Sequence, residues 1–210
     1  RDAIVGGIVD GTFKTGDRLG QIEIASVLGV SRQPVSHALK VLQEQGILVQ
    51  LGRKGLTVAP MDADHLLDLY EVRGTMDALA ARLAAERMGR GDVPISEISA
   101  LDRLIARQLD PAIKPSPADR VQADITFHAA LYRMSGNPVI EDVTRPHWIH
   151  FRRSIQTVLG DPEMYPPVWE QHRRILDAIR STDGIQAAAL AIEHTRTSAE
   201  KTANRLRADS

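Results

Sequence analysis

The chain has 210 residues, 43% apolar and only 4% aromatic, so it can form one or two domains with an aliphatic core. It has no cysteine, which excludes disulfides and thiolate metal ligands, and no run of roughly 18 apolar residues, so we expect a cytoplasmic protein without a membrane partner. The formal net charge is −1, but residues 1–60 carry seven Lys/Arg against five Asp/Glu, so only this part favours nucleic-acid binding.

The first expected elements are a helix over residues 1–11, weakened by two glycines, and a turn over residues 12–19. A short helix follows from Gln21 and ends at Gly29, because glycine tolerates the positive φ of a helix C-terminus. Its apolar face is expected to consist of Ile22, Ala25 and Leu28.

A second helix follows this turn. Ser31 is placed to cap it, and Pro34 lies in its first turn, where a missing N–H costs nothing. Its inward stripe at helical spacing is Val35, Ala38, Leu39 and Leu42. Its outer residues are Arg32, Gln33, Ser36, His37 and Lys40. This pattern is typical of a helix-turn-helix that recognises the DNA major groove, although any αα-hairpin has the same spacing.

Two β-prone runs, residues 47–50 and 56–59, flank a Gly-rich turn over residues 51–55. Two strands directly after the second helix predict the wing of a winged helix-turn-helix. Arg53 and Lys54 at its tip are expected to face phosphates or a minor groove.

These residues resemble a family of bacterial transcription regulators. The run A-S-V-L-G-V-S-R-Q-P-V-S-H-A-L-K-V-L-Q-E-Q-G (25–46) and the following G-R-K-G closely resemble the GntR family, and G-T-F-K-T-G-D-R-L (11–19) is similar to its turn after the first helix. The family usually has Arg-Glu where this chain has Ser36-His37, but Arg32 is retained. Loss of one bidentate contact between an arginine and guanine removes about 1–3 kcal/mol of discrimination against the wrong base. The resemblance therefore implies altered base recognition by Arg32, Gln33, Ser36 and His37.

From residue 62 onward the apolar pattern is helical. Asp62 or Asp64 is expected to cap a long helix over residues 62–88. Its inward stripe is expected to be Leu66, Leu69, Val72, Met76, Leu79, Leu83 and Met88. Five more helices are expected over residues 95–109, 118–134, 138–159, 168–180 and 184–207, with loops at 110–117 and 160–167. The third of these should break near Pro146.

This part resembles the FCD domain, the C-terminal domain of the fatty-acid-regulator branch of the GntR family. The likeness is carried by Y-E-V-R-G-T-M-D (70–77), D-I-T-F-H (124–128), S-G-N-P (135–138), E-Q-H-R-R-I-L-D-A-I (170–179) and E-H (193–194), with glutamate more usual at Asp77. We expect a mainly α protein, with a winged helix-turn-helix over residues 1–60 and a six- to seven-helix FCD bundle over residues 61–210.

Asp124 and His128 are spaced i, i+4, so both point from one helix face and can chelate one metal ion. His172 and His194 lie among apolar neighbours and are expected to face inward. Ordinary hydrogen-bonded core histidines have the same pattern. The FCD resemblance implies all four residues as metal ligands. Three imidazoles and a carboxylate suit a divalent transition metal, zinc first, with nickel or manganese as alternatives.

Arg73 lies near the apolar face of the long helix, where its guanidinium fork suits a carboxylate effector. An ion pair with Asp77 at i+4 is the alternative. Tyr70, Trp148 and Arg152 are further candidates to line the effector site.

The sequence thus predicts a ligand-responsive transcription regulator, and the resemblance implies a repressor, the type most common in the family. The expected partners are a second copy in a homodimer, a palindromic DNA operator and a small carboxylate. Two alternatives remain: a metal-dependent enzyme, although no glutamate follows a ligand in the H-E-x-x-H manner, and a DNA-binding regulator with a purely structural metal.

Overall fold

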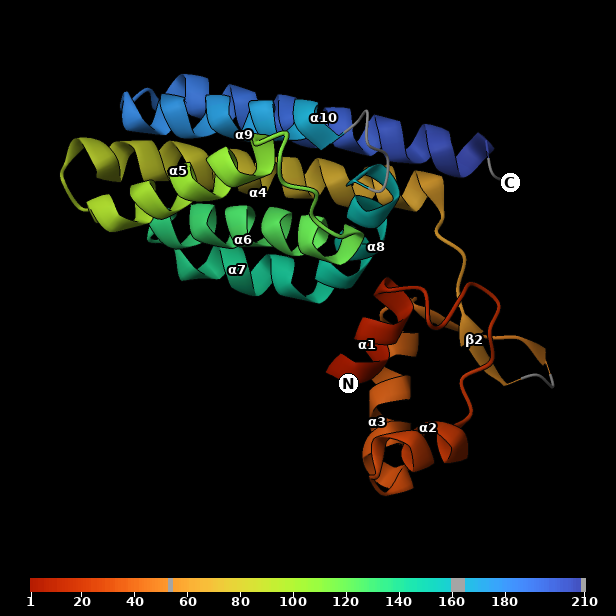
Figure 1. The fold of residues 1–210 in the computed structure, drawn as a ribbon. Coiled ribbons are helices and arrows are strands. Elements are labelled where there is room, and N and C mark those ends of the chain that lie inside the picture. Colours follow the sequence, from red (N-terminus) through yellow and green to blue (C-terminus); the bar gives the residue numbers. More distant parts are fainter. Residues whose placement is uncertain (53–54, 160–164, 209–210) are drawn as a thin grey trace. The chain divides into compact units, whose positions relative to one another are not determined.

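The computed structural model describes residues 1–52, 55–159 and 165–208 (Figure 1). Contacts between Cα atoms divide the chain into two compact units. The first comprises Arg1–Met61 with Ile149–Arg153, and the second comprises Asp62–Trp148 with Ser154–Ser210. Within the described ranges, no helix combines the length and the apolarity needed to cross a lipid bilayer.

The first unit is a winged helix-turn-helix. Its helices are α1 (Asp2–Val9), α2 (Gln21–Leu28) and α3 (Arg32–Glu44), and its wing strands are β1 (Leu48–Gln50) and β2 (Leu56–Val58). The strands pair antiparallel, with Leu48 opposite Val58. The four residues predicted for the inner stripe of α3 are buried, which confirms the period of this helix.

The turn between α2 and α3 has the predicted geometry. Gly29 ends α2 with a φ of 64°, and Ser31 occupies the N-cap position of α3, although its side chain makes no capping hydrogen bond. The predicted inner face of α2 is partly wrong, because Ile22 is 68% exposed and Leu28 is 40% exposed, whereas Ile24 is buried. Positions i, i+3 and i+6 spread over about 120° of a helix surface, so a helix that touches the core along a narrow strip cannot bury all three.

The second unit is a helical bundle with seven α-helices in its described part, the upper end of the predicted range. They are α4 (Ala63–Gly89), α5 (Ile95–Leu109), α6 (Pro117–Ser135), α7 (Pro138–Thr144), α8 (Trp148–Leu159), α9 (Tyr165–Arg180) and α10 (Gly184–Ala208). The 3₁₀ turn η2 (Arg145–His147) separates α7 from α8, as the proline there predicted. Figure 1 shows α4 and α10 side by side along the bundle, and α4 also packs against α6 and α9.

Local capping accounts for the starts of two of these helices. The Asp62 carboxylate accepts hydrogen bonds from the backbone of Asp64 and His65, and Ser116 forms a capping box with Asp119 at the start of α6.

Helix α9 begins at Tyr165, whereas we expected a loop up to residue 167. The two prolines that suggested that loop lie in the first turn of α9, where a missing N–H is tolerated.

The inner face of α4 differs from the predicted stripe of large apolar residues. Val72 is 54% exposed, whereas Arg73 and Asp77 are buried. Small residues make up most of the remaining buried positions: Gly74, Ala78, Ala80, Ala81, Ala84 and Ala85. A helix surrounded by several partners buries small residues at close contacts, and it can bury charged residues that neutralise each other. A search for large apolar residues at helical spacing detects neither the small nor the charged buried residues.

Candidate functional site

Four residues from three helices meet in the interior of the bundle. Asp124 and His128 project from α6, His172 from α9 and His194 from α10. Each offers one ligand atom, and these atoms all lie within 4.8 Å of one another. All four side chains are buried, which confirms the expectation that both distant histidines face inward.

The distances within this cluster are short. Nε2 of His172 lies 3.1 Å from Nε2 of His194 and 3.6 Å from Oδ1 of Asp124. Nε2 of His128 lies 3.8 Å from Oδ2 of Asp124. Ligand atoms bound tetrahedrally at 2.0–2.1 Å from zinc would be roughly 3.3 Å apart. The spacing of these nitrogens and oxygens is therefore close to that of a coordination shell.

Hydrogen bonding supports the same conclusion. Oε1 of Gln171 can only accept, so Nδ1 of His194 donates to it at 2.9 Å and the lone pair of Nε2 faces His172. Nε2 of His128 is buried and makes no hydrogen bond to any described residue. A buried imidazole nitrogen without a partner is unfavourable, and a cation at the centre of the cluster would satisfy it. The residues present thus fit a divalent metal ion.

Electrostatics favour a cation as well. Burial lowers the pKa of His172 and of His194 well below the usual value, so both imidazoles are neutral at pH 7, as metal ligation requires. Burial raises the pKa of Asp124, so its carboxylate is disfavoured when no positive charge compensates it. A bound cation would remove that penalty.

A second layer of polar groups surrounds His128. Oδ2 of Asp77 lies 3.3 Å from Nδ1 of His128 and 3.4 Å from Nε of Arg73, and the Tyr132 hydroxyl donates to Oδ1 of Asp77 at 2.5 Å. Burial raises the pKa of Asp77, but His128 and Arg73 outweigh it and bring the pKa to about 2. The ion pair between Arg73 and Asp77, the alternative considered for this arginine, is thus present. Tyr132 and Gln171 were not predicted as site residues, because both are ordinary polar positions on amphipathic helices.

The predicted effector residues fall into two groups. The Arg73 guanidinium carbon lies 5.3 Å from the centre of the Tyr70 ring and 5.2 Å from that of Trp148, so these three residues are close together. Tyr70 and Arg73 also line a cavity of about 10 Å³ with Asp124 and His194. Arg152 is not among the residues that line this cavity, and it belongs to the segment that groups with the first unit.

The predicted DNA-contacting residues lie on the outer side of α3. Arg32, Gln33, Ser36, His37 and Lys40 are all exposed. Their exposure opposite the buried stripe of α3 leaves them accessible to a major groove. Arg53 and Lys54, predicted at the wing tip, lie outside the described residues.

A winged helix-turn-helix joined to a helical bundle with a buried Asp/His₃ cluster defines a class of DNA-binding regulators. Comparison with known sequences agrees: residues 1–58 match the profile "Bacterial regulatory proteins, gntR family" and residues 68–197 match the FCD domain. The chain belongs to the GntR family of transcription regulators and carries its FCD domain. It is a DNA-binding transcription regulator of this type.

Individual relatives cover most of the chain. The Nta operon transcriptional regulator of Aminobacter aminovorans is 29% identical over 184 residues, 87% of this chain and 82% of the relative. The galactonate operon transcriptional repressor of Escherichia coli is 26% identical over 207 residues, 88% of this chain and 87% of the relative. Among solved structures, E. coli McbR/YncC has the same fold, with a TM-score of 0.79 and 19% identity over 97% of this chain and 95% of that one.

Proposed function

We propose that this protein is a metabolite-responsive repressor whose helical domain holds a divalent transition metal and senses a small organic acid. The observation that carries the proposal is the buried cluster of Asp124, His128, His172 and His194, whose ligand atoms lie within 4.8 Å of one another. Zinc suits this set of three imidazoles and one carboxylate, and nickel or manganese are the alternatives. When bound, the ion would supply a positive centre that anchors a carboxylate.

The residues next to the cluster favour an anionic ligand. Arg73 is buried beside it and close to two aromatic rings, and its guanidinium is permanently charged. Trp148 and Tyr70 give the site apolar walls that strengthen a charge–charge contact by excluding water. A relative named for a galactonate operon, and thus for a sugar acid, supports the choice of an organic acid.

On the DNA side, we propose that a homodimer places two copies of α3 in successive major grooves of a palindromic operator, in the cytoplasm. Arg32, Gln33, Ser36 and His37 would contact base edges, whereas Lys40 and the wing residues Arg53 and Lys54 would contact phosphates. The acid shifts DNA affinity only by the difference between its affinities for the DNA-binding and the DNA-free arrangements.

A purely structural metal is the second candidate. The cavity beside the cluster measures about 10 Å³, which is about the space of one water molecule. This candidate predicts that removal of the metal unfolds the bundle and that no small acid binds.

The first test is elemental analysis of untagged protein. We expect about one transition metal per chain in the wild type and its loss in His172→Ala, whereas His65→Ala, an exposed histidine at the start of α4, should keep it. No metal in the wild type would disprove the metal site.

The second test is a thermal-shift screen of the metal-loaded protein. We expect a panel of small acids that includes galactonate to contain a ligand that raises Tm, while galactose, which lacks the carboxylate, leaves it unchanged. Conversion of the acid to a product would instead support the metal-dependent enzyme.

A further inference from the structure

The cluster is buried in this conformation. The four ligand residues are at most 3% exposed, and the adjoining cavity of about 10 Å³ has room for about one water molecule. An organic acid does not fit in a cavity of this volume unless a wall of the cavity moves. The wall that moves must then be one of the residues that line this cavity.

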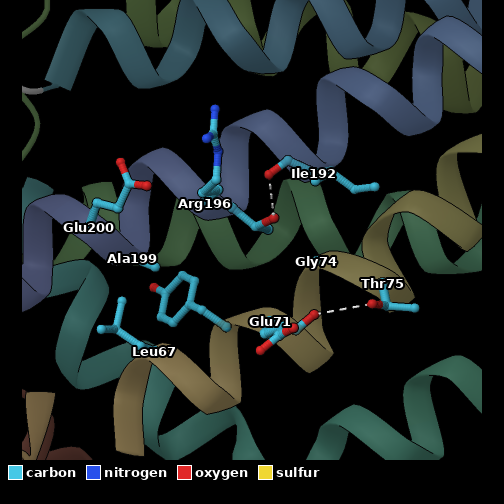
Figure 2. A pocket seen from close by; sticks show the side chains of 10 residues that line it. Leu67, Glu71, Gly74, Thr75, Ile192, Arg196, Ala199 and Glu200 are labelled. Carbon is cyan, nitrogen blue, oxygen red and sulfur yellow. Dashed lines mark hydrogen bonds between the residues drawn. The ribbon is translucent and has the colours of Figure 1, made fainter. Parts of the chain in front are cut away.

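A larger space lies on the other side of one of these walls. A groove of about 490 Å³ lies between α4 and α10, within the roughly 300–1,000 Å³ typical of small-molecule pockets. Figure 2 shows side chains from both helices around it, including Glu71 and Thr75 on α4 and Ile192, Arg196 and Glu200 on α10.

Tyr70 is the residue that the two spaces share. It lines the groove together with Thr195 and Ala199, and it lines the small cavity together with His194 and Ser198 of the same helix α10. Because it lines both spaces, the Tyr70 side chain forms part of the boundary between the groove and the cluster.

Among the contacts of Tyr70 are two that position its ring. Its hydroxyl shares a hydrogen bond of 2.8 Å with the Ser154 hydroxyl, and the Arg73 guanidinium lies 5.3 Å from the ring centre. Displacement of this ring would join the two spaces.

We propose that the groove between α4 and α10 is the chamber through which a metal ion and a small hydroxylated carboxylate reach the cluster, and that Tyr70 is the wall that moves. The inference rests on the proposed function, since it requires a metal at the cluster.

Charge orients the acid in this chamber. Glu71, Arg196 and Glu200 give the groove lining a net charge of about −1, so the groove suits the hydroxyl-bearing end of the ligand. Its carboxylate prefers the side beyond Tyr70, where Arg73 and a metal ion bound at the cluster would together supply positive charge. A hydroxy acid or a sugar acid has both a carboxylate and a hydroxyl-bearing end.

The test measures how fast Zn²⁺ leaves the metal-loaded, full-length protein into an excess of a chromogenic chelator. Tyr70→Ala removes the wall and should accelerate release at least tenfold. Ser154→Ala removes the hydrogen bond to the Tyr70 hydroxyl, and Ser154 lines neither space, so release should accelerate about two- to tenfold.

A pair of substitutions on α10 tests the route itself. Ile192 lines the groove and is 49% exposed, so Ile192→Trp should obstruct it and slow release at least threefold. Ile185 lies on the same helix, is 84% exposed and does not line the groove, so Ile185→Trp should release Zn²⁺ at the wild-type rate.

The outcomes separate the two proposals. A wild-type protein that binds no metal overturns the proposed function and the route with it. One metal per chain with unchanged release rates in Tyr70→Ala and Ile192→Trp overturns the route alone. If Tyr70→Ala fails to fold, as judged by circular dichroism, Ser154→Ala and Ile192→Trp decide the question.

Discussion

At the scale of single residues, Asp77 is the group that orients the candidate metal ligand His128. Its carboxylate lies 3.3 Å from Nδ1 of His128, so it favours a proton on Nδ1, which would leave the lone pair of Nε2 for the cluster. Loss of such a partner usually weakens metal binding 10- to 100-fold. We therefore predict that Asp77→Asn lowers Zn²⁺ affinity by about this factor, whereas Asp77→Glu, which keeps the charge, loses less.

Competition with a chromogenic chelator at pH 7.5 measures this affinity. Tyr132→Phe is the matched control, because it removes the hydrogen bond from the Tyr132 hydroxyl to Asp77 and leaves His128 in place. Its affinity should stay within about threefold of the wild type. Unchanged zinc affinity in Asp77→Asn would show that His128 needs no carboxylate to orient it.

The sequence predicted the candidate ligands better than their surroundings. Asp124 and His128 share one helix face by spacing alone, and the apolar neighbours of His172 and His194 indicated burial. The contact between Asp77 and Tyr132 joins residues 55 positions apart. No local pattern encodes which polar residues of two separate helices meet, because that depends on how the helices pack.

At the scale of elements, the contact between α4 and α10 depends on a missing side chain. A Cβ atom at Gly74 would lie 2.7 Å from Oγ1 of Thr195, which is buried and donates to the Ala191 carbonyl. Alanine favours a helix interior by up to about 1 kcal/mol over glycine, but overpacking costs about 1–3 kcal/mol. We predict that Gly74→Ala lowers the free energy of unfolding by roughly 1–2 kcal/mol.

Urea denaturation measures the effect, with two controls. Gly6→Ala in α1 places its Cβ where nothing lies within 4 Å, so it should stabilise the protein by about 0.4–1 kcal/mol. Adding Thr195→Ala to Gly74→Ala removes the clashing oxygen and should recover part of the loss. A stabilising Gly74→Ala would mean that the two helices can separate without cost.

The same contact explains why α4 was predicted less well than α3. Helix α3 buries one stripe and exposes the rest, so its apolar period is clear. Helix α4 packs against α6, α9 and α10, and its buried face mixes alanines with the pair Arg73–Asp77. A sequence pattern that looks for large apolar residues then selects Val72, which is exposed.

At the scale of the whole molecule, the buried imidazoles link folding to pH. Burial lowers the pKa of His172 and of His194, and nearby His128 and Arg73 lower it further. In the unfolded chain these two histidines bind protons with the ordinary pKa of 6.5, whereas in the folded protein without metal they stay unprotonated. Stability should therefore fall as the pH drops through and below 6.5, by at most about 1.4 kcal/mol per pH unit for each excluded proton.

Two carboxyl groups near the cluster modify this slope in ways that can be separated. Burial raises the pKa of Asp124, so the folded protein gains a proton there and partly offsets the loss, but one carboxyl opposes two imidazoles. Asp77 has a pKa lowered to about 2. Its contribution to the free energy of unfolding is therefore complete above pH 3.8 and is lost only as the pH falls toward 2. It therefore adds no slope between pH 7.5 and 5.5.

Urea denaturation of the metal-free protein at these two pH values checks the prediction. We expect the free energy of unfolding to fall by roughly 1–3 kcal/mol from pH 7.5 to 5.5, and His172→Gln to reduce that difference. His65→Gln changes an exposed histidine and should leave the difference as it is in the wild type. With Zn²⁺ bound, the fall should be steeper, because protons then also compete with the metal for the same nitrogens. A stability that rises toward pH 5.5 would show that the cluster binds protons in the folded state, and the histidines would then not be the neutral ligands that a metal requires.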